Sequence, residues 1–492
     1  MELTNHQNTI WAKMDKIFFG TPFKIIYLIY GFFAYFNVTF GTGWMKVPVW
    51  GSVALGVILI IYRLIRIPNY IKTKRIWLLI AFLISYVISI AVNLDYGYAE
   101  AVKALVWMGF HYFLLYACDV TQEPDAYKKE FYIMANIYLF ILFAAAVVSF
   151  VFLCMNYSYI LVHSGSQVIG GFTWGRLWGI FTDPNYGSVF CSAGIILSIY
   201  FFNIWKNVFL RICYCINILM LSIYLIFSDS RTGLVSVILA LGFYVYALLI
   251  RWDKLKLKMV WKQVCCILIA IVVMVGVFFL PKGVTKAYNA IILHIAASQQ
   301  IPDENNQTII DDTVKEKKFG REQDIEDDFT NQRFDLWMSG IEIFSTRPIL
   351  GVSFFNLIPY ATANLPDTFM INNDFGEHGN LHNAYLNILA GQGIVGFTIS
   401  VLFSAAVIIY VFRRFLRVDQ KDYHYIITLM GAVLACGVSA MFVSDIFYIH
   451  SPNSYIFWSF LGYLMHYFRN NIPLPFKGFN KKQEKELCQK SV

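Results

Sequence analysis

The chain has 492 residues, of which 58% are hydrophobic and 14% charged, and its mean hydropathy is +0.57. Soluble proteins are about 45–50% apolar and about 25% charged, so these values exclude a water-soluble globular enzyme. A net charge of +8 is by itself compatible with a nucleic-acid or acidic partner, so the positions of the charges must be examined.

Apolar runs of about 20 residues recur along the chain, and each is long enough to cross a bilayer as a helix. We therefore predict an all-α polytopic membrane protein with about twelve transmembrane helices. Their centres lie near residues 32, 56, 84, 109, 143, 197, 220, 241, 271, 398, 435 and 461. No internal repeat and no pair of matching broken spans is evident, which weakens a transporter hypothesis without excluding it.

The basic residues predict the orientation. With the N-terminus inside, 27 of the 39 Lys and Arg residues fall in cytoplasmic segments, whereas the short outer loops contain almost none. The positive-inside rule therefore places both termini in the cytoplasm. The predicted divisions are a cytoplasmic N-terminal segment (1–22), nine spans (23–280), an outer loop (281–383), three spans (384–468) and a cytoplasmic tail (469–492).

The long outer loop divides into two parts. Residues 300–328 contain ten acids and four bases with few apolar residues, which is typical of a solvated loop rather than a cation site. Residues 331–345 return to helical periodicity, with Phe334, Trp337 and Ile341 on one stripe. We predict an amphipathic helix here, lying at the outer surface.

Two outer arginines are candidates for function. Arg231 lies in a tight turn between two spans, and a charge at the edge of the apolar zone is costly to keep there. The alternatives are an interfacial anchor or an ion pair with Asp229. Arg333 is four residues before Trp337 on the predicted outer helix, where a packing contact with the indole is the alternative.

A histidine precedes the tenth span. We predict Asn380 as the N-cap of that helix, which places His382 in its first turn. The partly positive helix N-terminus disfavours imidazolium and should keep His382 neutral, the form that a general base needs. A purely structural role is the alternative.

Four motifs follow one another in residues 179–396. They are Gly179–Gly187 before the sixth span, Ser230–Gly233 before the eighth, Arg333–Trp337 leading to Arg347–Gly351, and His382–Leu386 leading to Gly391–Gly396. In this ordered set the chain resembles the O-antigen ligase and O-antigen polymerase superfamily of bacterial integral membrane glycosyltransferases, which are related to the GT-C class. The first five spans share only hydropathy with that family.

The resemblance implies roles for particular residues. It implies that His382 is the catalytic base and that Arg231 and Arg333 bind the diphosphate of a polyprenyl-diphosphate-linked oligosaccharide donor. Guanidinium groups can stabilise a diphosphate leaving group without a metal, and the chain has no Asp-x-Asp motif, so we expect no cofactor and no metal. The second-rank candidates for substrate contact are Arg176, Arg347, Trp337, His378 and Asn383.

The expected activity is transfer of a glycan to a glycan acceptor at the outer face of a bacterial cytoplasmic membrane. We favour a polymerase of surface-polysaccharide repeat units that acts by inverting displacement. The alternative is a ligase that moves finished glycan to a lipid, cell-wall or protein acceptor. A transporter or flippase of lipid-linked sugars is the competitor from another class. We expect lipid, and other polysaccharide-assembly proteins, as partners and no nucleic acid.

Overall fold

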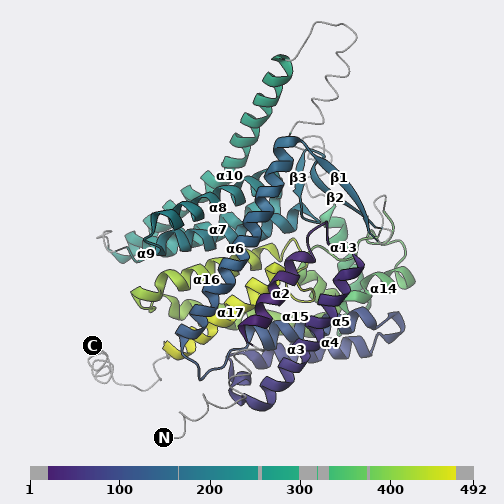
Figure 1. The fold of residues 1–492 in the computed structure, drawn as a ribbon. Coiled ribbons are helices and arrows are strands. Elements are labelled where there is room, and N and C mark those ends of the chain that lie inside the picture. Colours follow the sequence, from purple (N-terminus) through teal and green to yellow (C-terminus); the bar gives the residue numbers. More distant parts are fainter. Residues whose placement is uncertain are drawn as a thin grey trace, which may run out of the picture.

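A computed structural model describes residues 20–163, 166–252, 258–298, 319, 332–373 and 377–471, and helices dominate them (Figure 1). The first half contains the α-helices α2 (Thr21–Phe33), α3 (Lys46–Arg66), α4 (Ile76–Ala91), α5 (Ala99–Phe110) and α6 (Pro124–Met155). Between them lie three short 3₁₀ helices, η3 (Gly43–Met45), η4 (Pro68–Lys72) and η5 (Leu94–Tyr96), and a π-helix, η6 (His111–Tyr116). The second half contains α7 (Pro184–Ile204), α8 (Val208–Phe227), α9 (Arg231–Ile250), α10 (Met259–Ser298), α13 (Arg333–Thr346), η7 (Phe354–Asn356), α14 (Leu357–Asn364), α15 (Ala384–Phe415), α16 (Gln420–Ser439) and α17 (Pro452–Asn471).

The helices confirm the predicted fold class. Among the described residues, seven helices are long and apolar enough to cross a membrane, and α2 and α4 are shorter apolar helices. Each of the predicted span centres lies within a helix. The chain is therefore an all-α polytopic membrane protein, and the count of about twelve spans stays a prediction.

A small sheet interrupts the helices, and the sequence analysis had identified its segment only as a longer outer loop. Strands β1 (Ser158–His163), β2 (Ser166–Thr173) and β3 (Arg176–Gly179) form an antiparallel sheet in that order. The buried Asn37 fixes the sheet to the end of α2, because its Nδ2 donates to the carbonyl of Gly179 (3.2 Å) and its Oδ1 accepts from the hydroxyl of Tyr159 (2.7 Å). The sheet lies at the same end of the bundle as α13 and α14 (Figure 1).

The long outer segment begins and ends as helix. Helix α10 continues through Pro281 to Ser298, so the start of the predicted outer loop is helical. Helix α13 agrees closely with the amphipathic helix predicted over residues 331–345. The predicted acidic loop at 300–328 lies outside the described residues, apart from Phe319.

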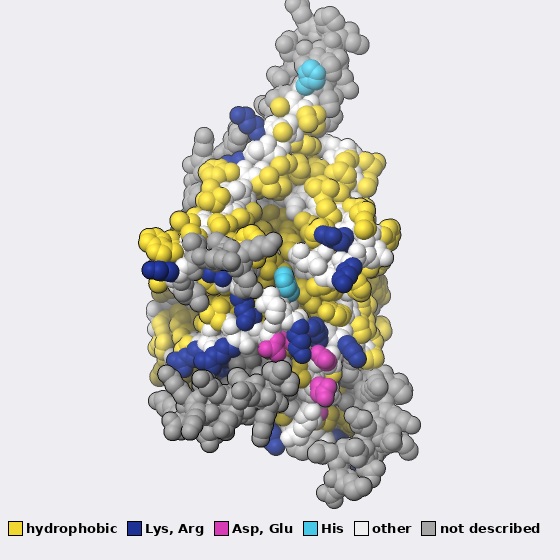
Figure 2. Space-filling model, turned by 90° about the vertical axis from the view of Figure 1, so that its left-hand side faces the viewer, with side chains coloured by type: hydrophobic (Ala, Val, Ile, Leu, Met, Phe, Trp, Pro, Cys, Tyr) yellow, Lys and Arg dark blue, Asp and Glu magenta, His cyan; other side chains and the backbone are white. Residues whose placement is uncertain are grey.

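Basic side chains gather at the opposite end of the bundle. Figure 2 shows the side that lies at the left of Figure 1, where Lys and Arg are more abundant than Asp and Glu. At the adjoining ends of α8, α9, α10, α15 and α16 the described basic residues are Lys206, Arg211, Arg251, Lys258, Lys262, Arg413, Arg414, Arg417 and Lys421. The positive-inside rule predicts such a cluster for one membrane face, and its assignment to the cytoplasm stays a prediction.

Helix α15 is broken, and a loop fills the break. Gly393 has φ 60° and ψ −164°, which is not helical, and Gly351 in the loop after α13 has φ 64°. The loop donates from Val352 N to the carbonyl of Ala390 (3.0 Å) and accepts at the carbonyl of Pro348 from Ile394 N (2.8 Å). These bonds satisfy backbone groups that the break exposes, as apolar surroundings require.

We expect Gly351→Ala to lower the free energy of unfolding by about 2 kcal/mol or more. A Cβ there would lie 2.5 Å from the carbonyl oxygen of Ala390 and from the amide nitrogen of Gln392, and the left-handed φ disfavours any other residue. Thermal unfolding in detergent measures the effect. Gly283→Ala is the control because a Cβ there meets nothing within 4 Å. Equal unfolding temperatures for the two variants would contradict this account.

Candidate functional site

Three helix N-termini carry the predicted functional segments. Helix α7 is capped by Asp183, which accepts from Asn185 N (2.6 Å), and α9 is capped by Ser230, which accepts from Gly233 N (3.2 Å). Helix α15 is capped by Asn383, whose Oδ1 accepts from Tyr385 N (3.0 Å). Since each helix N-terminus is partly positive, these ends favour anions nearby.

The N-terminal ends of α7 and α9 pack closely. A Cβ at Gly233 would lie 2.4 Å from the Ser188 hydroxyl, so only glycine allows this approach. The hydroxyl of Ser192 donates to the carbonyl of Gly233 (2.9 Å) and links the helices one turn further on. The glycine of the Ser-Arg-Thr-Gly motif therefore places the α9 N-terminus, with Arg231, beside the α7 N-terminus.

Arg176 connects the sheet to these helix ends. Its Nε donates to the carbonyl of Ser228 (2.9 Å) and its Nη2 donates to Oδ1 of Asn185 (3.4 Å). The same Oδ1 accepts from the hydroxyl of Ser230 (3.0 Å). Arg176 is only 8% exposed, so it acts in this structure as a buried connection between β3, α7 and the turn before α9.

Arg333 comes from a different part of the chain to the same place. It is the first residue of α13, and its Nη2 donates to the hydroxyl of Thr232 (3.5 Å), the residue after Arg231. Its guanidinium also lies 5.6 Å from the centre of the Phe442 ring. The structure thus brings the two predicted diphosphate-binding arginines to one helix N-terminus.

A network of amides and a hydroxyl holds the loop that carries His382. Asn380 Oδ1 accepts from His382 N (2.8 Å) and from the Ser444 hydroxyl (2.8 Å). That hydroxyl accepts from Asn387 Nδ2 (2.6 Å), and Asn387 Oδ1 accepts from Leu381 N (3.1 Å). The loop is therefore tied to both α15 and the segment after α16.

The predicted N-cap of the tenth-span helix was wrong by three residues. The N-cap of α15 is Asn383, whereas Asn380 caps a turn by binding His382 N. His382 precedes the helix and has φ 46°, a left-handed conformation that is uncommon for a residue other than glycine. Both asparagines can accept from a backbone amide two residues ahead, which explains why the sequence did not distinguish them.

The surroundings of His382 lower its pKa and so favour the neutral form. Burial lowers the pKa of His382 because desolvation disfavours the imidazolium form, while the carboxylate of Asp183 raises it. Arg333 and His378 each lower the pKa of His382 further. The histidine therefore lies within electrostatic range of the arginine from α13 and of the cap of α7.

The remaining predicted contact residues are Arg347, His378 and Trp337. Arg347 is exposed and follows the last residue of α13, which has 14 residues and is about 20 Å long, so the structure does not bring it to Arg333. His378 stacks on Phe369, with ring centres 5.9 Å apart. The side-chain nitrogens His378 Nε2 and Trp337 Nε1 are buried without a hydrogen-bond partner.

Three residues were missed or left unexplained by the sequence. Asn185 is a shared acceptor, and Asp183 is both a helix cap and a charge near His382. Asp445 is fully buried in the loop between α16 and α17, where Ser451 Oγ (3.0 Å) and Asn453 Nδ2 (3.1 Å) donate to it. Burial raises the pKa of Asp445 to about 6. In the sequence, Asp183 and Asn185 could be noticed because they belong to the Asp-Pro-Asn motif, whereas no pattern pointed to Asp445.

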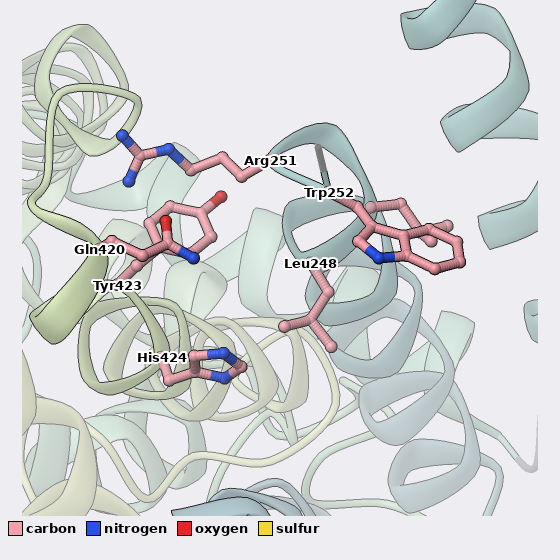
Figure 3. Close-up of a pocket in the computed structure, with 7 residues that line it drawn as sticks. Leu248, Arg251, Trp252, Gln420, Tyr423 and His424 are labelled. Atoms are coloured by element: carbon pink, nitrogen blue, oxygen red, sulfur yellow. The ribbon is translucent and has the colours of Figure 1, made fainter. Parts of the chain in front are cut away.

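A hollow of about 530 Å³ lies elsewhere, between the end of α9 and the start of α16. Figure 3 shows Leu248 and Trp252 on one side of it and Gln420, Tyr423 and His424 on the other, while the Arg251 side chain extends from α9 over Tyr423. Helix α9 has 20 residues, so this hollow is about 30 Å from Arg231 at the other end of the helix. It is separate from the candidate site.

Comparison with known proteins supports the resemblance seen in the motifs. Residues 216–401 match a family model described as O-antigen ligase, and this range contains Arg231, Arg333 and His382. No curated protein matches the chain. Over these residues the chain is similar to the O-antigen ligase family, and this match together with the apolar helices indicates a multi-pass membrane enzyme of the glycosyltransferase type.

Proposed function

We propose that this protein polymerises polyprenyl-diphosphate-linked oligosaccharide repeat units of a surface polysaccharide at the outer face of a bacterial cytoplasmic membrane. One observation carries the proposal. Arg333 reaches the α9 N-terminus next to Arg231, and the same arginine lies within electrostatic range of His382. The closeness of two arginines, a helix N-terminus and a histidine of lowered pKa supports a site that combines anion binding with general-base catalysis.

The proposed reaction is a single displacement. His382 accepts the proton of an acceptor sugar hydroxyl as its oxygen attacks the anomeric carbon of the donor. The bond from that carbon to the diphosphate oxygen breaks, and polyprenyl diphosphate leaves with the bonding electrons. Attack from the side opposite the leaving group inverts the anomeric centre, and no protein nucleophile is needed.

The diphosphate leaving group gains negative charge during this step, and nearby cationic side chains can stabilise that charge. Arg231, Arg333 and the partly positive end of α9 would stabilise the developing diphosphate charge in surroundings of low dielectric constant. Among the described residues, no group of three or more His, Cys, Asp and Glu side chains is arranged to hold a metal ion. Guanidinium groups can supply this stabilisation without a metal, and we propose that the arginines do so here.

A polymerase and a ligase differ in the acceptor that receives the glycan. The donor chemistry is the same in a polymerase and in a ligase that transfers finished glycan, so the residues above fit both. Transport of lipid-linked sugars is a weaker proposal, because the three principal residues lie at or before helix N-termini in the part of the chain assigned to the outer face.

Deletion of the gene and complementation test the proposal. We expect deletion to abolish the ladder of surface-glycan lengths while single repeat units remain, as seen on one gel. Polymer that accumulates on its lipid carrier would indicate a ligase instead. In a transfer assay with purified protein, His382→Ala should lower the rate by about 10²–10⁴-fold, the usual contribution of a general base.

The matched control is His424→Ala. His424 lies in α16 beside the separate hollow and has no part in the proposed step. Both variants must reach the membrane in equal amount. Normal glycan from the His382 variant would exclude the proposed base, and equal losses from both variants would point to folding rather than catalysis.

The pH dependence of transfer should respond to Asp183→Asn. The Asp183 carboxylate raises the pKa of His382, so its removal should lower that pKa and keep the base form present at lower pH. Asparagine caps a helix as well as aspartate does, so α7 should remain intact. We expect the acid limb of the rate profile to move to lower pH, whereas Asp119→Asn should leave it in place. A shift to higher pH would contradict this assignment.

Metal independence has a direct test. Transfer by purified protein should keep its rate to within about twofold after treatment with EDTA, because guanidinium groups supply the charge stabilisation. A loss of rate that added Mg²⁺ or Mn²⁺ restores would show that a divalent ion takes part.

A further inference from the structure

The turn between β2 and β3 holds a tryptophan in an unfavourable conformation. Trp174 and Gly175 form this two-residue turn, since Thr173 pairs with Arg176, and both have positive φ, 51° and 64°. Such turns favour glycine or asparagine, and a bulky residue in the left-handed region is an outlier. The Trp174 side chain is 67% exposed, so burial does not explain its presence. An exposed, strained tryptophan suggests that its ring serves another molecule.

A hollow of about 430 Å³ lies beside this tryptophan. Its lining consists of Ser158, Tyr159, Ile160, Ile169, Thr173 and Trp174. Ser158 and Ile160 pair with Gly171 and Ile169 on the neighbouring strand. An aromatic ring, two aliphatic side chains and hydroxyl groups together offer both an apolar surface and hydrogen-bonding groups.

Hydrogen bonds hold the sheet to the helices, and one end of it leads to the candidate site. Asn37 holds one side of it through Tyr159 and Gly179. Trp178 packs edge-on to Trp174, with ring centres 5.8 Å apart, and its indole nitrogen is buried without a hydrogen-bond partner. Arg176, two residues from Trp174, donates to Asn185 at the α7 N-terminus. Arg176 is also the cross-strand partner of Thr173, which lines the hollow, so the hollow adjoins the candidate site.

We propose that this hollow is a glycan subsite, in which the Trp174 ring stacks on the apolar face of a sugar while the hydroxyl-bearing side chains contact its hydroxyl groups. The inference rests on the proposed function, because it assigns the hollow to the oligosaccharide part of the donor or acceptor. Insertion of the sheet into lipid is the competing explanation for the exposed Ile160 and Trp174. The hydroxyl groups around the hollow and its connection to Arg176 favour the sugar.

Glycan binding without transfer tests the subsite. The probe is the cell's own surface polysaccharide, released from its carrier by mild acid and cut to short oligomers, with dextran oligomers as the unrelated glycan. Purified protein in nanodiscs should bind the probe more tightly than dextran. Trp174→Ala should weaken binding at least tenfold, and Trp174→Phe should restore part of it, because a smaller aromatic ring still stacks.

The control is Trp205→Ala, an exposed tryptophan at the far end of α7. It should bind the probe as the wild type does, and so should His382→Ala. Binding by the His382 variant separates the two proposals, since transfer can fail while the subsite persists. Equal binding by wild type and Trp174→Ala, or none by wild type, would overturn the subsite. Quenching by brominated lipids that disappears in Trp174→Phe would place the sheet in the bilayer and overturn it as well.

Discussion

The loop after α13 and the break in α15 form the contact on which the site depends. Gly351 and Gly393 allow two backbone segments to approach more closely than any Cβ would permit, and backbone hydrogen bonds then join them. Arg333 lies at the far end of α13, and His382 lies just before α15. One glycine-based contact therefore sets the relative positions of an arginine and a histidine that are 49 residues apart in the sequence. Helix α4 also stabilises this contact, because Ser89 donates to the carbonyl of Gly391 (2.8 Å) and Asn93 donates to the carbonyl of Gly351 (3.0 Å).

This arrangement gives the glycines of the family motifs a structural meaning. The Arg-Pro-Ile-Leu-Gly and Gly-Gln-Gly segments pack on each other, whereas the Ser-Arg-Thr-Gly segment packs on α7 through Gly233. Broken helices in membranes need partners for the freed backbone groups, and here a neighbouring loop and polar residues of α4 supply them. The motifs thus combine a candidate site residue with a glycine that allows close packing of its helix or loop.

The sequence predicted the helices and the principal residues for different reasons. Hydropathy over about 20 residues is a strong local signal, and the 3.6-residue period located α13 because Phe334, Trp337 and Ile341 lie on one stripe. The convergence of Arg231 and Arg333 came from the family resemblance, since a contact between residues 102 positions apart leaves no local pattern. The sheet escaped prediction because its strands are short and depend on Asn37, more than 120 positions away from its partners. Asp445 lay in an ordinary loop sequence, where burial cannot be read from composition.

Asp183, the residue before Pro184, has a role in the charge balance around His382, because its carboxylate and the Arg333 guanidinium shift the pKa of His382 in opposite directions. A site that binds diphosphate needs cations, but cations also lower the pKa of a nearby histidine and so weaken it as a base. Asp183 acts against Arg333 in this respect, and as the cap of α7 it accepts the amide of Asn185, which keeps the carboxylate fixed. Asn185 in turn accepts from Arg176 and Ser230. In the Asp-Pro-Asn segment, Asp183 therefore offsets the effect of Arg333 on the pKa of His382, and Asn185 orders the neighbouring helix ends. A neutral residue at position 183 could cap α7 but could not offset the arginine.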